Sequence, residues 1–181
     1  MSLKKMTQSK HSGAERTWFA GLMMSGEITP EQYSVYLKQQ YECYTALEDR
    51  FNTTEGSISP IPEELKRAPN IMKDLKELSE DIENIPVFQS TNRYVDYILN
   101  DCEVDLLYAH VYVRYLGDLK GGQMIAKRVP GEGKYYQFQN AEKLEVFIRS
   151  QLGEDKGFVK ECDKCFDSAI TLFKDLKSHL S

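Results

Sequence analysis

Apolar residues recur at helical spacing along most of the chain, and no stretch of any length alternates between apolar and polar residues with a period of two. The pattern predicts helices over residues 30–51, 71–85, 90–127, 141–152 and 158–180. The first has the clearest start, because Thr29 can cap the helix, Pro30 suits its first position and Gln32 can close a capping box. The 90–127 helix is apolar on most sides near its middle, so we expect it to be central and buried. The pattern therefore predicts an all-α protein.

Size and composition fit one soluble globular domain over residues 1–181. With 41% hydrophobic and 28% charged residues, a chain of this length can bury a core and enclose a pocket. A formal net charge of -5 argues against nucleic acid as a partner. The longest stretch without a charged side chain, Thr17 to Gly26, is about half of the roughly 20 residues in a membrane-spanning helix, so we expect no membrane association. Four cysteines without a dense framework favour a reducing cytoplasm.

Glycines interrupt the second half of the central helix at Gly117, Gly121 and Gly122. A glycine inside a helix costs roughly 1 kcal/mol relative to alanine, so some other requirement must keep these residues. Gly117 and Gly121 are four residues apart and share a face, where a flat ligand could touch the backbone or another helix could pack closely. Asp118 lies between them and could face that opening or pair with Arg114, four residues earlier.

The histidines offer the other half of a possible site. His11 is followed four residues later by Glu15, a spacing at which the carboxylate can accept the N–H of one ring nitrogen and orient the other toward a metal. A buried histidine satisfied by its carboxylate is the common alternative. His110 lies in the apolar middle of the central helix, and we expect it to be a core histidine satisfied by a neighbour.

Other metal chemistries fit the sequence poorly. Cys162 and Cys165 fall on the apolar face of the last helix, and no second Cys/His pair completes a zinc site, so we expect buried thiols. No histidine has a glutamate three residues before it, which argues against a di-iron helical bundle.

Residues 112–123 resemble the signature helix of the haem (heme) oxygenases, and the string Arg114-Tyr115-Leu116-Gly117-Asp118-Leu119-Lys120-Gly121-Gly122-Gln123 matches it at nearly every position. The resemblance extends over most of the chain. Lys10 to Glu15 resembles the proximal helix of that family. Further blocks agree in order and separation over residues 44–48, 62–65, 133–140 and 172–176.

The resemblance implies a single helical domain that holds haem b between a proximal and a distal helix. His11 would be the axial ligand of the haem iron through one ring nitrogen, and Glu15 would hold the other. Gly117 and Gly121 would form the distal wall, where haem and dioxygen lie against backbone. Asp118 would anchor a water network that supplies a proton to iron-bound peroxide, which then attacks the porphyrin instead of losing its O–O bond.

The resemblance also implies the reaction. Haem would be both cofactor and substrate, opened with dioxygen and outside electrons to biliverdin, carbon monoxide and ferrous iron, with the IXα isomer expected from usual family behaviour. The chain ends at Ser181 without the hydrophobic tail of membrane-anchored relatives. It therefore resembles the short soluble forms of bacteria, photosynthetic organisms or their viruses. We expect a monomer in the cytoplasm or plastid stroma that takes electrons from reduced ferredoxin or a similar donor and supplies a phycobilin pathway.

Lys4, Tyr112 and Arg149 match the positions at which the family holds the haem propionates. Gln8 and Glu145 depart from the pattern, because many relatives have basic residues there. A basic rim for an acidic ferredoxin is a further expectation, with solvated surface cations as the equal alternative. Its members would be Lys10, Arg16, Lys120, Lys127 and Arg128.

The sequence also allows two other kinds of function. A haem carrier or sensor would share the fold and His11 but would have no need of Asp118 with its flanking glycines. A relative with the same fold and another ligand, or a plain interaction module, would bind no haem, and His11 with Glu15 would be core structure.

Overall fold

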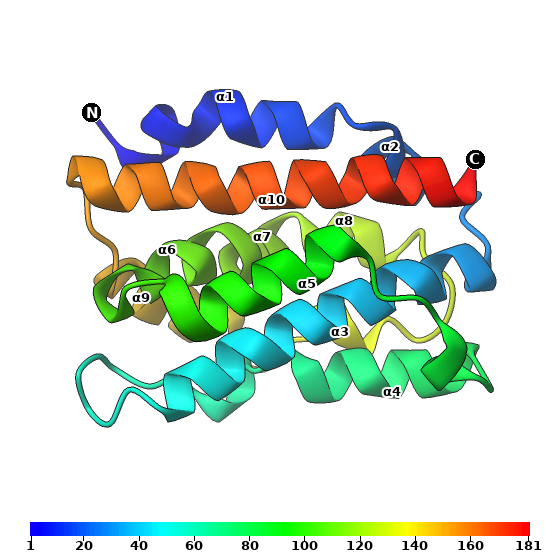
Figure 1. Ribbon diagram of the computed structural model, residues 1–181, viewed down its shortest axis with the longest axis horizontal. Coiled ribbons are helices and arrows are strands. Elements are labelled where there is room, and N and C mark those ends of the chain that lie inside the picture. The colour runs from blue at the N-terminus through cyan, green and yellow to red at the C-terminus, as the bar shows by residue number, and fades with distance from the viewer.

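The computed structural model describes all residues 1–181 and contains helices and turns but no strand, as predicted (Figure 1). The α-helices are α1 (Leu3–Glu15), α2 (Trp18–Ser25), α3 (Pro30–Asn52), α4 (Ala68–Leu78), α5 (Gln89–Asp96), α6 (Leu107–Val111), α7 (Gly117–Lys120), α8 (Gly122–Ala126), α9 (Ala141–Ser150) and α10 (Lys156–Leu180). Two π-helical turns cover Tyr97–Asp101 and Tyr112–Leu116. Short 3₁₀ turns cover Glu63–Leu65, Ile82–Asn84, Val104–Leu106 and Lys134–Tyr136.

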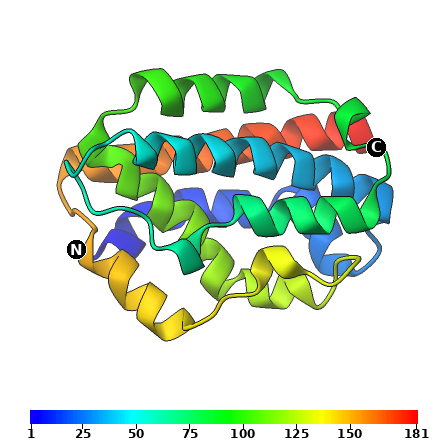
Figure 2. The same cartoon turned by 90° about the horizontal axis from the view of Figure 1, so that it is seen from below.

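The helices stack in layers along one long direction (Figure 1). Helix α10 runs the length of the molecule with α1 lying along one side of it, and α3 and α4 form the opposite layer. The segment from α6 to α8 lies between these layers and crosses them obliquely (Figure 2). Helix α9 lies at the edge of the molecule, on the same side as the N-terminal end of α1 (Figures 1 and 2). This arrangement places residues 107–126 at the centre.

The start of α3 confirms the predicted capping box. The Thr29 hydroxyl accepts from the Gln32 backbone N–H at 3.1 Å, and the Gln32 side chain accepts from the Thr29 N–H at 3.0 Å. Pro30 occupies the first helical position, where it has no N–H to lose. The apolar face that follows is buried, with Tyr33 and Leu37 fully inaccessible to solvent.

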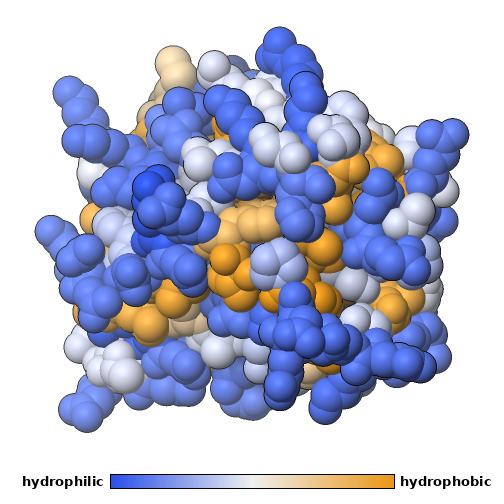
Figure 3. Space-filling model, turned by 45° about the vertical axis from the view of Figure 1, so that its right-hand side comes forward, coloured by the Kyte–Doolittle hydropathy of each residue, from blue (hydrophilic) through white to orange (hydrophobic).

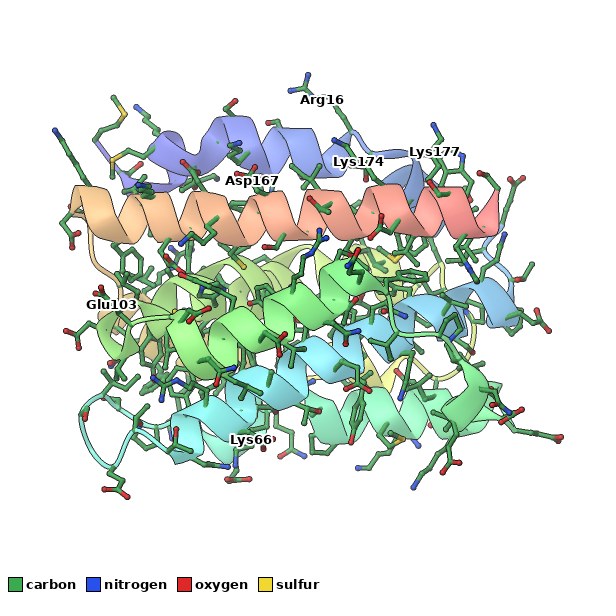
Figure 4. The ribbon with its side chains drawn as sticks, in the orientation of Figure 1. Arg16, Lys66, Glu103, Asp167, Lys174 and Lys177 are labelled. Atoms are coloured by element: carbon green, nitrogen blue, oxygen red, sulfur yellow. The ribbon has the colours of Figure 1, made fainter.

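The expected single helix over residues 90–127 is wrong, because the chain breaks at Cys102 and Glu103. A π-helical turn ends when the Cys102 N–H donates to the Tyr97 carbonyl at 2.8 Å, and both residues at the break are extended. Glu103 lies at one end of the molecule, where the chain turns back (Figure 4). Apolar residues continue at helical spacing on both sides of the break, so the periodicity does not reveal it.

Two other predicted helices differ from expectation, one in its length and one in its start, where Asn140 has the residue type of an N-cap. The helix predicted over residues 71–85 is shorter, because α4 ends at Leu78 and the backbone of Ser79 is extended. Asn140 precedes α9 with a left-handed φ of 56° and gives no side-chain cap. Asparagine tolerates this conformation better than most residues, so the backbone turns at Asn140 without capping the helix.

The apolar faces form one continuous core. All four cysteines are free and buried, which confirms the expectation for Cys162 and Cys165. Hydrophilic side chains dominate the face in Figure 3, and hydrophobic atoms gather near its middle in the recesses between them. No helix has both the length and the apolar character needed to cross a bilayer.

Candidate functional site

A pocket of about 360 Å³ lies between α1 and residues 112–121, with α9 at its mouth. Every residue that the sequence analysis assigned to cofactor binding lines it: Lys4, His11, Glu15, Tyr112, Gly117, Gly121 and Arg149. Asp118 does not line the pocket and lies directly behind its glycine wall. The fold therefore brings together two segments that are about 100 residues apart in the chain.

His11 extends into this pocket from α1. Half of its side chain is exposed, and its Nε2 lies 3.7 Å from Glu15 Oε1, beyond hydrogen-bonding distance. The ring forms a T-shaped pair with Phe166 from α10 at a centroid distance of 5.9 Å. His11 is therefore not a core histidine satisfied by its carboxylate, and its ring nitrogens are available to a ligand.

His110 occupies the opposite environment and confirms its assignment to the core. It is fully buried, with Nδ1 2.7 Å from the Tyr94 hydroxyl and Nε2 2.8 Å from Glu161 Oε1. Burial alone would raise the pKa of Glu161, but hydrogen bonds from His110 and Tyr97 outweigh it and lower the pKa to about 2. His110 and Glu161 thus form a buried ion pair that joins α6 to α10.

The wall opposite His11 is made of bare backbone at Gly117 and Gly121. A Cβ atom on Gly117 would have no other atom within 4 Å, and one on Gly121 would meet only the Gly117 carbonyl oxygen at 3.4 Å. Close helix packing therefore does not explain this pair, and side chains here would project into the pocket. Gly122 differs, because a Cβ there would lie 2.4 Å from the Tyr136 ring. Packing explains Gly122, whereas the open pocket explains Gly117 and Gly121.

The π-helical turn of Tyr112–Leu116 directly precedes the glycine wall. Such turns widen a helix and are frequent at functional sites. Gly121 then donates its N–H to the Gly117 carbonyl at 2.8 Å, so the backbone between the two glycines stays regular. The wall is consequently regular helical backbone that follows a local widening.

Asp118 lies behind this wall among tyrosines. Its carboxylate accepts hydrogen bonds from the Tyr44 hydroxyl and, at 3.2 Å, from the Tyr135 hydroxyl. Burial raises the pKa of Asp118 to about 7, although these phenols and the positive charges of Arg67 and Arg114 act in the opposite direction. A carboxyl group with this pKa can give up and take back a proton near neutral pH.

Arg114 does not pair with Asp118, so the i,i+4 ion pair considered above is absent. Its Nε donates to the Tyr94 hydroxyl at 3.0 Å, and its guanidinium lies 4.3 Å from the centroid of that ring. Its Nη1 donates to the Gln40 side chain at 3.4 Å, and Gln40 donates in turn to the Tyr135 hydroxyl at 2.9 Å. Arg114 therefore reaches Asp118 by hydrogen bonds only through intermediate side chains, and acts on it directly only through its charge.

Tyr44 and Tyr135 are site residues that the sequence patterns did not predict. They are 74 and 17 residues from Asp118 in the chain, and both are fully buried. Both fall inside blocks that resemble the haem oxygenases, which is the only signal that could have drawn attention to them.

Cations gather at the mouth of the pocket. Lys4, Lys120 and Arg149 line it together with Tyr112, whereas Gln8 donates to the Ser12 hydroxyl at 3.0 Å and brings no charge. The remaining members of the expected basic rim differ in whether their charge is paired. Lys10 pairs with Asp167 of α10 at 2.6 Å, in the gap between α1 and α10 where Figure 4 labels Asp167. Arg16, Lys127 and Arg128 are exposed.

Comparisons with known proteins identify the family of the chain. A sequence model of the family described as "Heme oxygenase" matches residues 1–175. Haem oxygenase of the pufferfish Takifugu rubripes is 38% identical over 205 residues, which cover 99% of this chain and 74% of that protein. Mouse haem oxygenase 2 is 30% identical over 201 residues, which cover 96% of this chain and 64% of that protein. The chain thus spans less than two thirds of the length of the mouse relative.

Solved structures share the fold. Haem oxygenase-1 of the cyanobacterium Synechocystis, in complex with haem, superposes with a TM-score of 0.85 at 24% identity, over 98% of this chain and 91% of that one. Haem oxygenase-2 of Synechocystis, in complex with haem and NO, gives a TM-score of 0.83 at 26% identity, over 97% and 84%. With the family match over nearly the whole sequence, these likenesses show that the chain belongs to the haem oxygenase family.

Proposed function

We propose that this protein is a haem oxygenase that binds haem b between α1 and residues 117–121 and opens its ring with dioxygen and outside electrons. The products would be biliverdin, with the IXα isomer expected, carbon monoxide and ferrous iron. One observation carries the proposal: the half-exposed His11 faces a pocket whose other wall is the bare backbone of Gly117 and Gly121. A side chain on either glycine would fill part of this pocket, whereas the bare backbone leaves the space open to a flat tetrapyrrole.

His11 would supply the axial nitrogen on the α1 side. Glu15 Oε1 already lies 3.7 Å from one ring nitrogen, so a small rotation lets the carboxylate accept that N–H while the other nitrogen binds the iron. The T-shaped contact with Phe166 limits the orientations of the ring.

Bound haem would supply the iron at which dioxygen is activated. The wall opposite His11 offers no histidine or arginine side chain, and the bare backbone of Gly117 and Gly121 would leave room for water beside bound haem. Asp118 would hold and pass on a proton at its carboxylate, while Tyr44 and Tyr135 fix the orientation of that group. Arg114 is held on Tyr94, so no direct ion pair locks Asp118 in its charged form.

The haem propionates would meet Lys4, Tyr112 and Arg149 at the mouth, where Lys120 adds a further cation. Gln8 can contribute only a neutral hydrogen bond. Reduced ferredoxin or a similar acidic donor would supply the electrons, and Arg16, Lys127 and Arg128 are exposed and so accessible to such a donor. The free cysteines support a reducing compartment, with the protein acting as a monomer in the cytoplasm or stroma and its bilin feeding pigment synthesis.

The test is a visible spectrum of the purified protein with one equivalent of haemin, followed in air after addition of a ferredoxin reducing system, with catalase present to remove peroxide. We expect a Soret band that decays while bilin absorbance rises. A Soret band that remains with ferredoxin and with a second donor would identify a haem carrier instead. Absence of any Soret shift would contradict haem binding itself.

A further inference from the structure

A closed cluster of three charged side chains lies at the mouth of the pocket. Glu145 of α9 accepts a hydrogen bond from Lys120 Nζ of α7 at 2.9 Å through Oε2. Its Oε1 accepts from Arg149, one turn later on α9, at 3.1 Å from Nε and 3.0 Å from Nη2. Each oxygen of the carboxylate therefore binds a different cation, and the cluster joins α7, which carries the glycine wall, to α9.

The two cations line the pocket, whereas Glu145 does not. The Glu145 side chain is 23% exposed, against 60% for Lys120 and 54% for Arg149. The hydrogen bond from Lys120 holds the pKa of Glu145 below its usual range, so this group is ionised at neutral pH. A protein carboxylate thus already occupies two of the cations that a carboxylate ligand would approach.

We propose that Glu145 competes with a propionate of the bound tetrapyrrole for Lys120 and Arg149. This inference rests on the proposed function. A propionate that reaches these cations displaces Glu145, and Glu145 takes them back when the tetrapyrrole leaves. Glu145 therefore weakens the binding of dicarboxylate tetrapyrroles and speeds the release of a bilin product, which keeps both carboxylates.

The competition acts only on ligands that carry carboxylates. Haemin has two propionates, whereas its dimethyl ester has the same ring and iron without the negative charges. Exposed ion pairs are individually weak, so we expect removal of the Glu145 charge to tighten haemin binding by about three- to tenfold. The affinity for the dimethyl ester stays unchanged.

The experiment compares Glu145→Gln with a matched control, Glu142→Gln. Glu142 is exposed on the same helix and takes part in no ion pair, so its substitution removes the same formal charge without freeing a cation. Titration of each protein with haemin and with its dimethyl ester, followed by the Soret band in one mixed solvent, gives the affinities. E145Q should bind haemin more tightly and release biliverdin more slowly, and about 0.5 M salt should remove most of the gain because it screens the exposed charges.

Several results would overturn the proposal. Unchanged haemin affinity in E145Q would show no competition, and weaker binding would show that Glu145 organises the cations for the ligand. If E145Q also bound the dimethyl ester more tightly by the same factor, or if E142Q gained the same affinity for haemin, the effect would not come from competition with the propionates. Lys120→Gln in the E145Q background should remove part of the gain, and an unaltered gain would exclude Lys120. Wild-type haemin binding and turnover are measured first, so a failure of the proposed function is seen separately.

Discussion

The wall of the pocket and the core behind it use the same residue types for opposite purposes. On the pocket side His11 is half exposed without a hydrogen-bonded partner, and Gly117 faces open space. On the core side both ring nitrogens of His110 are satisfied, and Gly122 lies against the Tyr136 ring. Residue type and helical spacing do not separate these cases, because the difference comes from which elements pack on each face.

This contrast predicts a separation of stability from binding. Groups whose partners are all inside the protein hold the fold together, so their loss destabilises it. Groups left without partners at a pocket are free to bind a ligand, so their loss changes binding while the fold persists.

The largest effect is expected for His11→Ala. Loss of the only histidine in the pocket should remove the native axial ligand, so the Soret maximum of the haemin complex shifts and bilin formation is lost. Urea unfolding of the ligand-free variant should differ from wild type by no more than about 0.5 kcal/mol, because the side chain makes no hydrogen bond. A native spectrum with normal turnover in H11A would remove His11 from the site.

His110→Ala is the matched change on the core side. It leaves the Glu161 carboxylate buried without its imidazole partner, and breaking a buried pair in this way costs about 3–5 kcal/mol in the free energy of unfolding. Urea denaturation measures it. A loss below about 1 kcal/mol would mean that water or Lys164 compensates, and the contrast with His11 would fail.

The same pair gives a dependence of stability on pH. The folded pKa of Glu161, about 2, is below its unfolded value of roughly 4.3, so its contribution is present above pH 4.3 and is lost as the pH falls toward 2. The acid limb of wild-type stability should therefore be steeper over this range than that of Glu161→Gln. Parallel acid limbs in the two proteins would show that Glu161 has no depressed pKa.

Gly122→Ala and Gly117→Ala compare a glycine packed against the core with a glycine that faces the pocket. The alanine methyl at 122 would overlap Tyr136, so we expect a loss of about 1–3 kcal/mol in the free energy of unfolding. At 117 the methyl meets nothing, so stability should hold or rise by up to about 1 kcal/mol through helix propensity while haemin binding weakens. Equal effects on stability at both positions would contradict the division between wall and core.

The sequence predicted what depends on local chemistry. The capping box at Thr29 and the placement of His110 in the core both follow from neighbours within a few residues. The family resemblance assigned the pocket residues to one site, and the fold places them around one cavity. The break at Cys102 was not predictable, because apolar spacing continues across it. The partners of Asp118 and His110 come from distant parts of the chain, which no spacing rule reaches.

Asp118 lies on the boundary between wall and core, and the smallest expected effect concerns its proton. If the water network needs the protonated carboxyl, bilin formation in a single turnover should decline as the pH rises through about 7, and Asp118→Asn should abolish this inflection. The Tyr44 hydroxyl donates to the carboxylate and lowers its pKa, so Tyr44→Phe should move the inflection to higher pH by up to about one unit while haemin still binds. An inflection that stays near 7 in Y44F, or moves to lower pH, would show that another group titrates. A profile unchanged in D118N would exclude Asp118 as the proton source and assign it, with its tyrosines, to the core.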